Sequence, residues 1–227
     1  LDKAQAHLDS LTKPPGSLGI LEELAKRYVA IQNNESPTLK KISTIVFAAD
    51  HGVTAEGVSA YPSEVTPQMV MNFLNKGAAV NVLANHVNAE VTIVDIGVNF
   101  KFQNHPNLLD RKIAFGTKNF SKEPSMTRPQ AEKSIATGIK IATESAKNGI
   151  DILTTGEMGI GNTTPSSAIF SILGDTLVED VTGRGTGIDD SALTKKISLI
   201  KKGLELHQPD PDDPIDILAK VGGFEIG

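Results

Sequence analysis

Residues 156–165 have the sequence Gly-Glu-Met-Gly-Ile-Gly-Asn-Thr-Thr-Pro, and this stretch gives the strongest indication of the fold. It follows an apolar run at 150–155 that is typical of a buried strand, and it precedes residues 166–173, which predict a helix. Glycines between a strand and a helix let the backbone approach a ligand closely, and the free N–H groups of a helix start favour an anion. The stretch therefore predicts a phosphate-binding turn with one carboxylate, Glu157, beside it.

Further apolar runs predict buried strands at residues 42–49 and 91–96, and residues 113–115 predict a short strand. Strands that alternate with helices and have no polar face are typical of an α/β protein with an open parallel sheet and helices on both faces. Residues 99–111 lack such patterns and are expected to form a loop. Helical spacing is found at residues 1–31 with a break at 13–19, and at 65–87, 130–148, 189–207 and 215–221.

Polar side chains near the expected helix starts predict where the helices begin, because a side-chain oxygen there accepts a bond from a free backbone N–H. Pro165 suits the first turn of the helix that follows the glycine-rich stretch. The side chains expected to cap helices are Ser17, Thr163 or Thr164, and Asp189 or Asp190.

Three expected strand ends carry polar or glycine-rich sequence, at 50–52, 95–97 and 156–162. In parallel α/β sheets ligands bind beyond the carboxyl ends of the strands, so we expect these segments to meet at one crevice. Asp50 and His51 fit a helix cap and a hydrogen-bonded core histidine as well as they fit a site. Asp95 is expected to hold backbone amides of the following loop.

A second glycine-rich turn, Gly-Arg-Gly-Thr-Gly at 183–187, lacks the spacing of a dinucleotide-binding fingerprint. Lys195 and Lys196 follow it in the next expected helix. Such a pair usually forms a solvated helix face, but one lysine could instead reach a phosphate. Tyr61 and Met69 suit either the core or the wall of a flat aromatic pocket.

The composition excludes several classes of function. The net charge of −5 provides no basic field for nucleic acid or anionic membrane. The absence of cysteine excludes disulfides, thiolate catalysis and cysteine-ligated metal sites, and it fits a cytoplasmic protein. No apolar run approaches the length needed to span a membrane. We therefore expect neither nucleic acid nor a membrane as a partner.

Five segments, in this order, resemble the nicotinate-nucleotide–dimethylbenzimidazole phosphoribosyltransferase family, which makes the lower-ligand nucleotide of cobalamin. The resemblance covers the whole chain, and the combination is far more specific than one glycine loop. The segments are LTKPPGSLG at 11–19, AADHGV at 48–53, YPSEVT at 61–66, GEMGIGNTTP at 156–165 and KVGGFE at 220–225.

The resemblance implies a Rossmann-like domain at residues 41–227, with residues 1–40 forming a linker and part of a small helical domain. It implies a homodimer that transfers phosphoribose from nicotinate mononucleotide to dimethylbenzimidazole, with neither a cofactor nor a metal. Glu157 would lie near the base nitrogen. The implied phosphate-binding residues are Gly159, Asn162, Thr163, Gly185 and Lys196, and Tyr61, Met69 and Met158 would line the base pocket.

The resemblance also places the main catalytic glutamate of the family, and the rest of its helical domain, beyond Gly227. The abrupt end at Gly222-Gly223-Phe224-Glu225-Ile226-Gly227 leads us to expect that the family's chain continues further.

Two other hypotheses remain open from the residues themselves. Asp50, His51 and Asp95 at adjacent strand ends are compatible with a metal-dependent hydrolase, because acidic groups there could bind magnesium or manganese. The chain could also be a nucleotide-binding module without catalytic activity.

Overall fold

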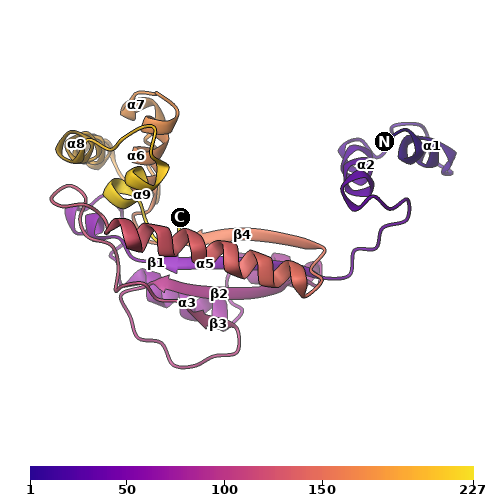
Figure 1. Ribbon diagram of the computed structural model, residues 1–227, viewed down its shortest axis with the longest axis horizontal. Coiled ribbons are helices and arrows are strands. Elements are labelled where there is room, and N and C mark those ends of the chain that lie inside the picture. Colours follow the sequence, from indigo (N-terminus) through magenta and orange to yellow (C-terminus); the bar gives the residue numbers. More distant parts are fainter. The chain divides into compact units, whose positions relative to one another are not determined.

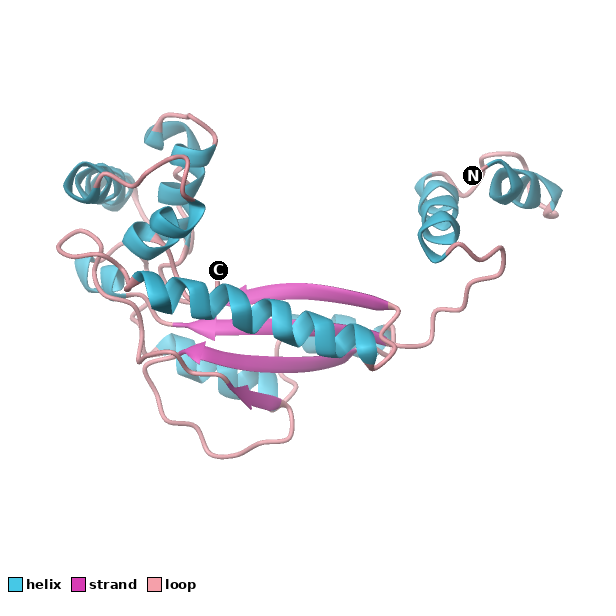
Figure 2. Cartoon of the chain, in the orientation of Figure 1, coloured by secondary structure: helices cyan, strands magenta, loops and turns pink.

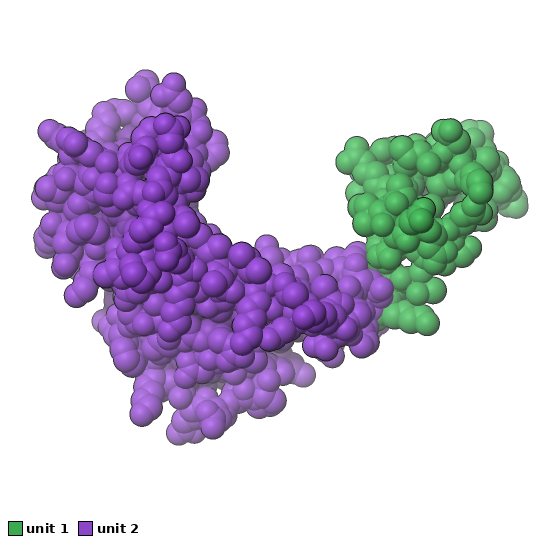
Figure 3. Space-filling view, in the orientation of Figure 1, with its two compact units in different colours: residues 1–40 green, residues 41–227 purple.

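The computed structural model describes residues 1–227, which form two compact units, residues 1–40 and 41–227 (Figure 3). The first unit contains helices α1 (Asp2–Ser10) and α2 (Ile20–Gln32), with the expected break between them. The prediction that Ser17 begins the second helix is wrong. Gly19 precedes the helix with a φ of +57°, a left-handed conformation that an α-helix cannot contain.

The second unit is built on a four-stranded sheet whose neighbouring strands are all parallel (Figures 1 and 2). The spatial order is β3-β2-β1-β4, which confirms the expected open α/β sheet. The strands are β1 (Ile42–Ala49), β2 (Glu90–Gly97), β3 (Leu108–Asp110) and β4 (Ile152–Met158).

Helices cover both faces of this sheet. On one face, α5 and α9 pack against Ile45 and Val94, and on the other α3 packs against Val46 and Ile93 (Figure 1). A third cluster joins α6, α8 and α9 around Phe120. The helices are α3 (Val65–Leu74), α4 (Ala79–His86), α5 (Arg128–Lys147), α6 (Thr163–Leu173), α7 (Val178–Val181), α8 (Asp190–His207) and α9 (Pro214–Val221), with a 3₁₀ helix at Gly52–Glu56. None of these helices has both the length and the apolar character that crossing a membrane requires.

Two sequence predictions about these elements are wrong. The single helix expected at 65–87 is broken into α3 and α4, because Lys76 has a φ of +62° and Gly77 follows it. The short strand expected at 113–115 does not form. β3 lies instead at Leu108–Asp110, inside the segment expected to be a loop, and pairs with Ile93–Asp95 of β2.

The glycine-rich stretch also starts later than expected, because β4 continues through Met158 while it remains paired with β1. Asn162 is the N-cap of α6, so the prediction that Thr163 or Thr164 caps this helix is wrong. By contrast, the cap predicted for α8 is confirmed, since the side chain of Asp189 accepts a hydrogen bond from Ala192 N at 2.8 Å.

Gly97 at the end of β2 provides a test of this packing. A Cβ on Gly97 would lie 2.5 Å from Phe224 Cδ2 and 3.1 Å from Ala49 Cβ. We expect Gly97→Ala to destabilise the protein by about 1–3 kcal/mol through overpacking, measured by urea unfolding.

The matched control is Gly138→Ala in α5, where a Cβ would meet nothing within 4 Å. This variant should gain roughly 0.8–1.0 kcal/mol from helix propensity. Equal effects of the two alanines would contradict the packing described at Gly97.

Candidate active site at the carboxyl edge of the sheet

The carboxyl ends of β1, β2 and β4 lie side by side at one edge of the sheet. Ala49 is paired with Gly97, and Ala48 is paired with Met158. The three polar segments that follow these strands therefore start from neighbouring positions, as the sequence predicted.

Lys196 is the centre of the phosphate-binding residues implied by the sequence. Its ammonium donates hydrogen bonds to Thr163 Oγ1 at 2.7 Å and to the Gly183 carbonyl at 3.2 Å. The residue is only 1% exposed, and this burial lowers the pKa of its ammonium. Lys195 beside it is exposed, so the two lysines do not form a common solvated face.

Gly185 brings the second glycine-rich turn against the start of α6. Its φ is +51°, and a Cβ there would lie 2.9 Å from Thr163 Oγ1 and 3.5 Å from Lys196 Nζ. The hydroxyl of Thr186 accepts a hydrogen bond from Ala60 N at 3.0 Å, which attaches the loop containing Tyr61 to this turn. The start of α6, the turn at 183–187 and α8 thus meet at the exposed residue Thr163 and the buried ammonium of Lys196.

Glu157 and Asn162 lie next to this group, and the Asn162 amide donates a hydrogen bond to Glu157 Oε2. Partial burial raises the pKa of the Glu157 carboxyl, with a further contribution from the charge of Glu225. Because a carboxylate with a raised pKa accepts a proton more readily, Glu157 has the electrostatics of a general base.

Gly159 is buried, and packing alone accounts for its lack of a side chain. A Cβ would lie 2.5 Å from the Ala49 carbonyl and 2.9 Å from both Glu225 Oε1 and His51 Nε2. A direct contact of Gly159 with phosphate stays a prediction.

The residues predicted for the base pocket are only partly brought together. Met69 and Met158 pack against the same core cluster on the α3 face, whereas Tyr61 is 54% exposed. Because successive strand residues face opposite sides, Glu157 faces the α5 side together with Phe47, away from Met158.

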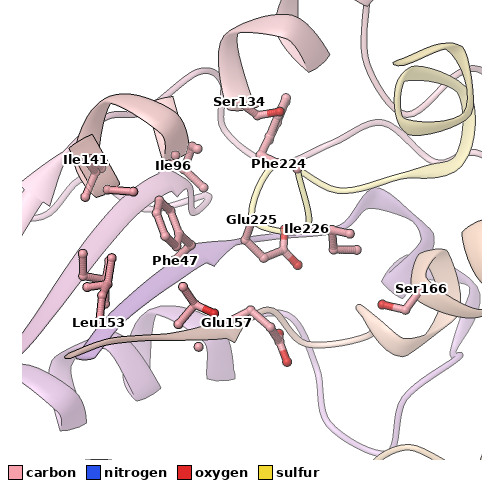
Figure 4. A pocket seen from close by; sticks show the side chains of 16 residues that line it. Phe47, Ile96, Ser134, Ile141, Leu153, Glu157, Ser166, Phe224, Glu225 and Ile226 are labelled. Atoms are coloured by element: carbon pink, nitrogen blue, oxygen red, sulfur yellow. The ribbon is translucent and has the colours of Figure 1, made fainter. Parts of the chain in front are cut away.

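On the α5 side, Glu157 contributes to a pocket of about 480 Å³ (Figure 4). The wall is mostly apolar, and Glu225 supplies its other carboxylate. The side chains labelled in Figure 4 are Phe47, Ile96, Ser134, Ile141, Leu153, Glu157, Ser166, Phe224, Glu225 and Ile226.

The metal-site hypothesis finds no support in the geometry. His51 is paired with Glu225, and both oxygens of Asp95 accept bonds from Lys112 at 2.9 and 2.7 Å. Asp95 Oδ1 also accepts a bond from Val98 N at 2.9 Å, which confirms its expected role in holding loop amides. Nowhere in residues 1–227 do three or more His, Asp or Glu side chains form a group suited to a metal ion.

Glu225 is the residue that sequence reasoning left without a role. It lies in the segment 220–225, but its partner, His51, is 174 residues away. The one local signal was an acidic residue after two glycines and a phenylalanine, a pattern that does not identify a partner.

The fold and the site together define an α/β protein with an open parallel sheet and a buried lysine between two glycine-rich turns at its carboxyl edge. A profile of a phosphoribosyltransferase family matches residues 1–227. The chain belongs to this phosphoribosyltransferase family.

Several relatives carry the name nicotinate-nucleotide–dimethylbenzimidazole phosphoribosyltransferase. The proteins of Geobacter sp. strain M21 and Chloroflexus aggregans are each 56% identical, over 226 and 224 residues. These alignments cover 100% and 99% of this chain but 65% and 64% of the relatives, so the chain spans just under two thirds of their length.

Solved structures agree with these relatives. The crystal structure of CobT from Thermus thermophilus superposes with a TM-score of 0.90 at 42% identity, covering 99% of this chain and 67% of that one. A second structure from the same organism has the relatives' name, with a TM-score of 0.88 at 41% identity over 99% and 66% of the two chains.

Gly185 offers a direct test of the phosphate-binding residues. Gly185→Ala should weaken binding of inorganic phosphate at least about tenfold, equivalent to 1.4 kcal/mol, because its methyl group would crowd Thr163 and Lys196. Isothermal titration calorimetry measures this change.

Gly187→Ala is the matched control. Gly187 also has a positive φ, +97°, but a Cβ there would meet nothing within 4 Å. It should carry a similar backbone strain and keep its phosphate affinity. A loss of affinity in Gly187→Ala alone would contradict the assignment of Gly185.

Proposed function

We propose that this protein transfers phosphoribose from nicotinate mononucleotide to dimethylbenzimidazole, giving α-ribazole phosphate and nicotinate, in assembly of the cobalamin nucleotide loop. Family membership along residues 1–227 supports the reaction class, and the names of the relatives support the substrates. The chain spans just under two thirds of the length of those relatives, so the activity and the substrates are a proposal for this protein.

The observation that carries the proposal is the buried ammonium of Lys196 beside Thr163 and Gly185. Both of its hydrogen bonds go to neutral oxygens, so its positive charge has no carboxylate partner among residues 1–227. A buried charge is costly unless an opposite charge accompanies it. The phosphate of a mononucleotide would supply that charge at the N-terminus of α6, where the backbone N–H of Thr163 makes no hydrogen bond within residues 1–227.

The reaction is a displacement at the anomeric carbon of the ribose. The bond from this carbon to the pyridinium nitrogen breaks, and its electron pair leaves with nicotinate, which neutralises the ring nitrogen. A benzimidazole nitrogen forms the new bond from the opposite face, which inverts the carbon and gives the α linkage. The benzimidazole N–H proton passes to a carboxylate base.

In this proposal Glu157 lies near the acceptor nitrogen and assists the uptake of that proton, for which the raised pKa of its carboxyl is suited. The main catalytic glutamate that the resemblance implies is not among residues 1–227. Binding of the phosphate holds the ribose between the nicotinate ring and the benzimidazole ring. This positioning of the reacting groups lowers the barrier of the displacement. Gly159 and Asn162 would complete the phosphate contacts. Tyr61, Met69 and Met158 stay the residues that the resemblance implies for the base pocket, although Met69 and Met158 lie on the α3 face of the sheet, opposite Glu157.

We further propose that the protein acts as a cytoplasmic homodimer, as the resemblance implies. Size-exclusion chromatography with light scattering would report a mass twice that of the chain. A monomer at assay concentration would contradict this assembly.

The reaction itself is tested by incubating the full-length gene product with nicotinate mononucleotide and dimethylbenzimidazole. Chromatography should detect nicotinate and α-ribazole phosphate in equal amounts. A full-length protein that binds the mononucleotide without releasing nicotinate would instead be a binding module.

Lys196→Ala should weaken binding of nicotinate mononucleotide by about 1.5–3 kcal/mol, since a charge-assisted hydrogen bond to phosphate would be lost. Titration calorimetry measures the affinity. Lys195→Ala removes the same charge from an exposed neighbour and should have little effect. Equal losses in the two variants would point to a diffuse field rather than a contact by Lys196.

A further inference from the structure

His51 and Glu225 form a hydrogen-bonded pair inside the protein. His51 Nε2 and Glu225 Oε1 are 2.5 Å apart, and the two side chains are 1% and 0% exposed. The pair joins the loop after β1 to the segment after α9. The second oxygen of Glu225, Oε2, is buried without a hydrogen-bond partner, so the carboxylate charge is only partly compensated.

Two glycines from separate segments make room for the pair. A Cβ on Gly159 would lie 2.9 Å from both His51 Nε2 and Glu225 Oε1. A Cβ on Gly223 would overlap the His51 ring and lie 2.9 Å from Glu225 Oε2. The pair is therefore packed between the glycine-rich stretch after β4 and the segment that carries Glu225 itself.

Stability alone does not explain such an arrangement. The desolvation of two buried charges offsets most of their attraction, and hydrophobic residues of similar volume often stabilise a protein as well or better. Buried charged groups near a cleft are more often found where a functional group must be tuned. Glu157 is that neighbouring group: it lies two residues before Gly159 and lines the same pocket as Glu225 (Figure 4).

We propose that the His51–Glu225 pair is a positioning element for Glu157, which holds the turn at Gly159 in place and sets the electric field at the Glu157 carboxylate. The functional meaning of this inference rests on the proposed function, in which Glu157 assists the removal of the proton from the acceptor base. The effect of the pair on the pKa of the Glu157 carboxyl does not depend on the reaction that the protein catalyses.

The two charges act on Glu157 in opposite directions. Beyond partial burial, which raises the pKa of the Glu157 carboxyl most, the negative charge of Glu225 raises it further, whereas His51 lowers it. The effect of Glu225 is the larger of the two, so the intact pair makes Glu157 a stronger base than it would be alone.

The charge state of His51 follows from its surroundings. Burial disfavours its protonation and is the largest single effect, but the carboxylates of Glu225, Asp50 and Glu157 together raise the pKa of the imidazole above 6.5. Asp50 follows β1, Glu157 lies near the end of β4, and Glu225 follows α9. These three carboxylates are the charged groups that act on His51. A raised histidine pKa stabilises the fold at low pH, and this contribution is lost as the pH rises through the folded-state value.

The experiment measures the pKa of Glu157 in the 227-residue chain by ¹³C NMR of its carboxyl carbon, in three proteins. His51→Gln removes the positive charge and should raise this pKa. The double variant His51→Gln/Glu225→Gln replaces both charged side chains by neutral side chains of similar shape, and it should lower the pKa of Glu157. The single and the double variant should therefore shift the pKa of Glu157 in opposite directions.

Glu123→Gln is the control for loss of a carboxylate, because Glu123 is exposed and its charge is screened. It should leave the Glu157 pKa unchanged. A role of the pair in stability alone would not produce shifts of opposite sign in the single and double variants. Unchanged values, or shifts in the same direction, would overturn the proposal.

If His51→Gln does not fold, the unaltered chain still decides the electrostatics. The ring nitrogens of His51, followed by ¹⁵N NMR, should both remain mostly protonated at pH 6.5, the midpoint of an unperturbed histidine. A ring that is half titrated at or below this pH would overturn the proposed charged pair.

The catalytic consequence is read separately, from the pH dependence of kcat/KM in the full-length protein. The double variant should move the acid limb of this profile to lower pH, in step with the Glu157 pKa. An unshifted limb beside a shifted pKa would overturn the role of the pair in the reaction. Absence of nicotinate release from the unaltered protein would contradict the proposed function and leave the NMR result standing.

Discussion

The site depends on one buried cation, the ammonium of Lys196, held 2.7 Å from Thr163 Oγ1. Burial lowers the pKa of this group, which means that the fold does not fully replace the water it excludes. Such a lysine binds an anion strongly when one arrives, because the anion supplies the missing charge. The buried side chain thus opposes stability while it favours ligand binding.

The parallel sheet brings the parts of this site together. Pairing of β1 with β4 places the glycine-rich stretch beside the loop after β1, and Gly159 then fits against the Ala49 carbonyl. Its missing side chain leaves room for the His51–Glu225 pair. The glycines of the two turns therefore serve two purposes, since Gly159 leaves room for neighbouring protein groups while Gly185 opens space beside Lys196.

Much of the fold follows from sequence pattern because its causes are local. Unbroken apolar runs predicted β1, β2 and β4, and an aspartate before a helical repeat predicted the cap at Asp189. The helix break at Lys76 was missed because apolar spacing continues across it. The site was predicted in part: Thr163, Gly185 and Lys196 do meet, whereas the partner of His51 depends on a contact across 174 residues that no local pattern encodes.

A crystal structure of the protein with nicotinate mononucleotide is the most direct test of the central claim. The phosphate should lie within hydrogen-bond distance, about 2.7–3.2 Å, of Lys196 Nζ and of the backbone N–H of Thr163 at the start of α6, with Gly185 in contact. The ribose should extend from there toward Glu157. A phosphate bound elsewhere, with Lys196 still hydrogen-bonded only to Thr163 and Gly183, would contradict the account.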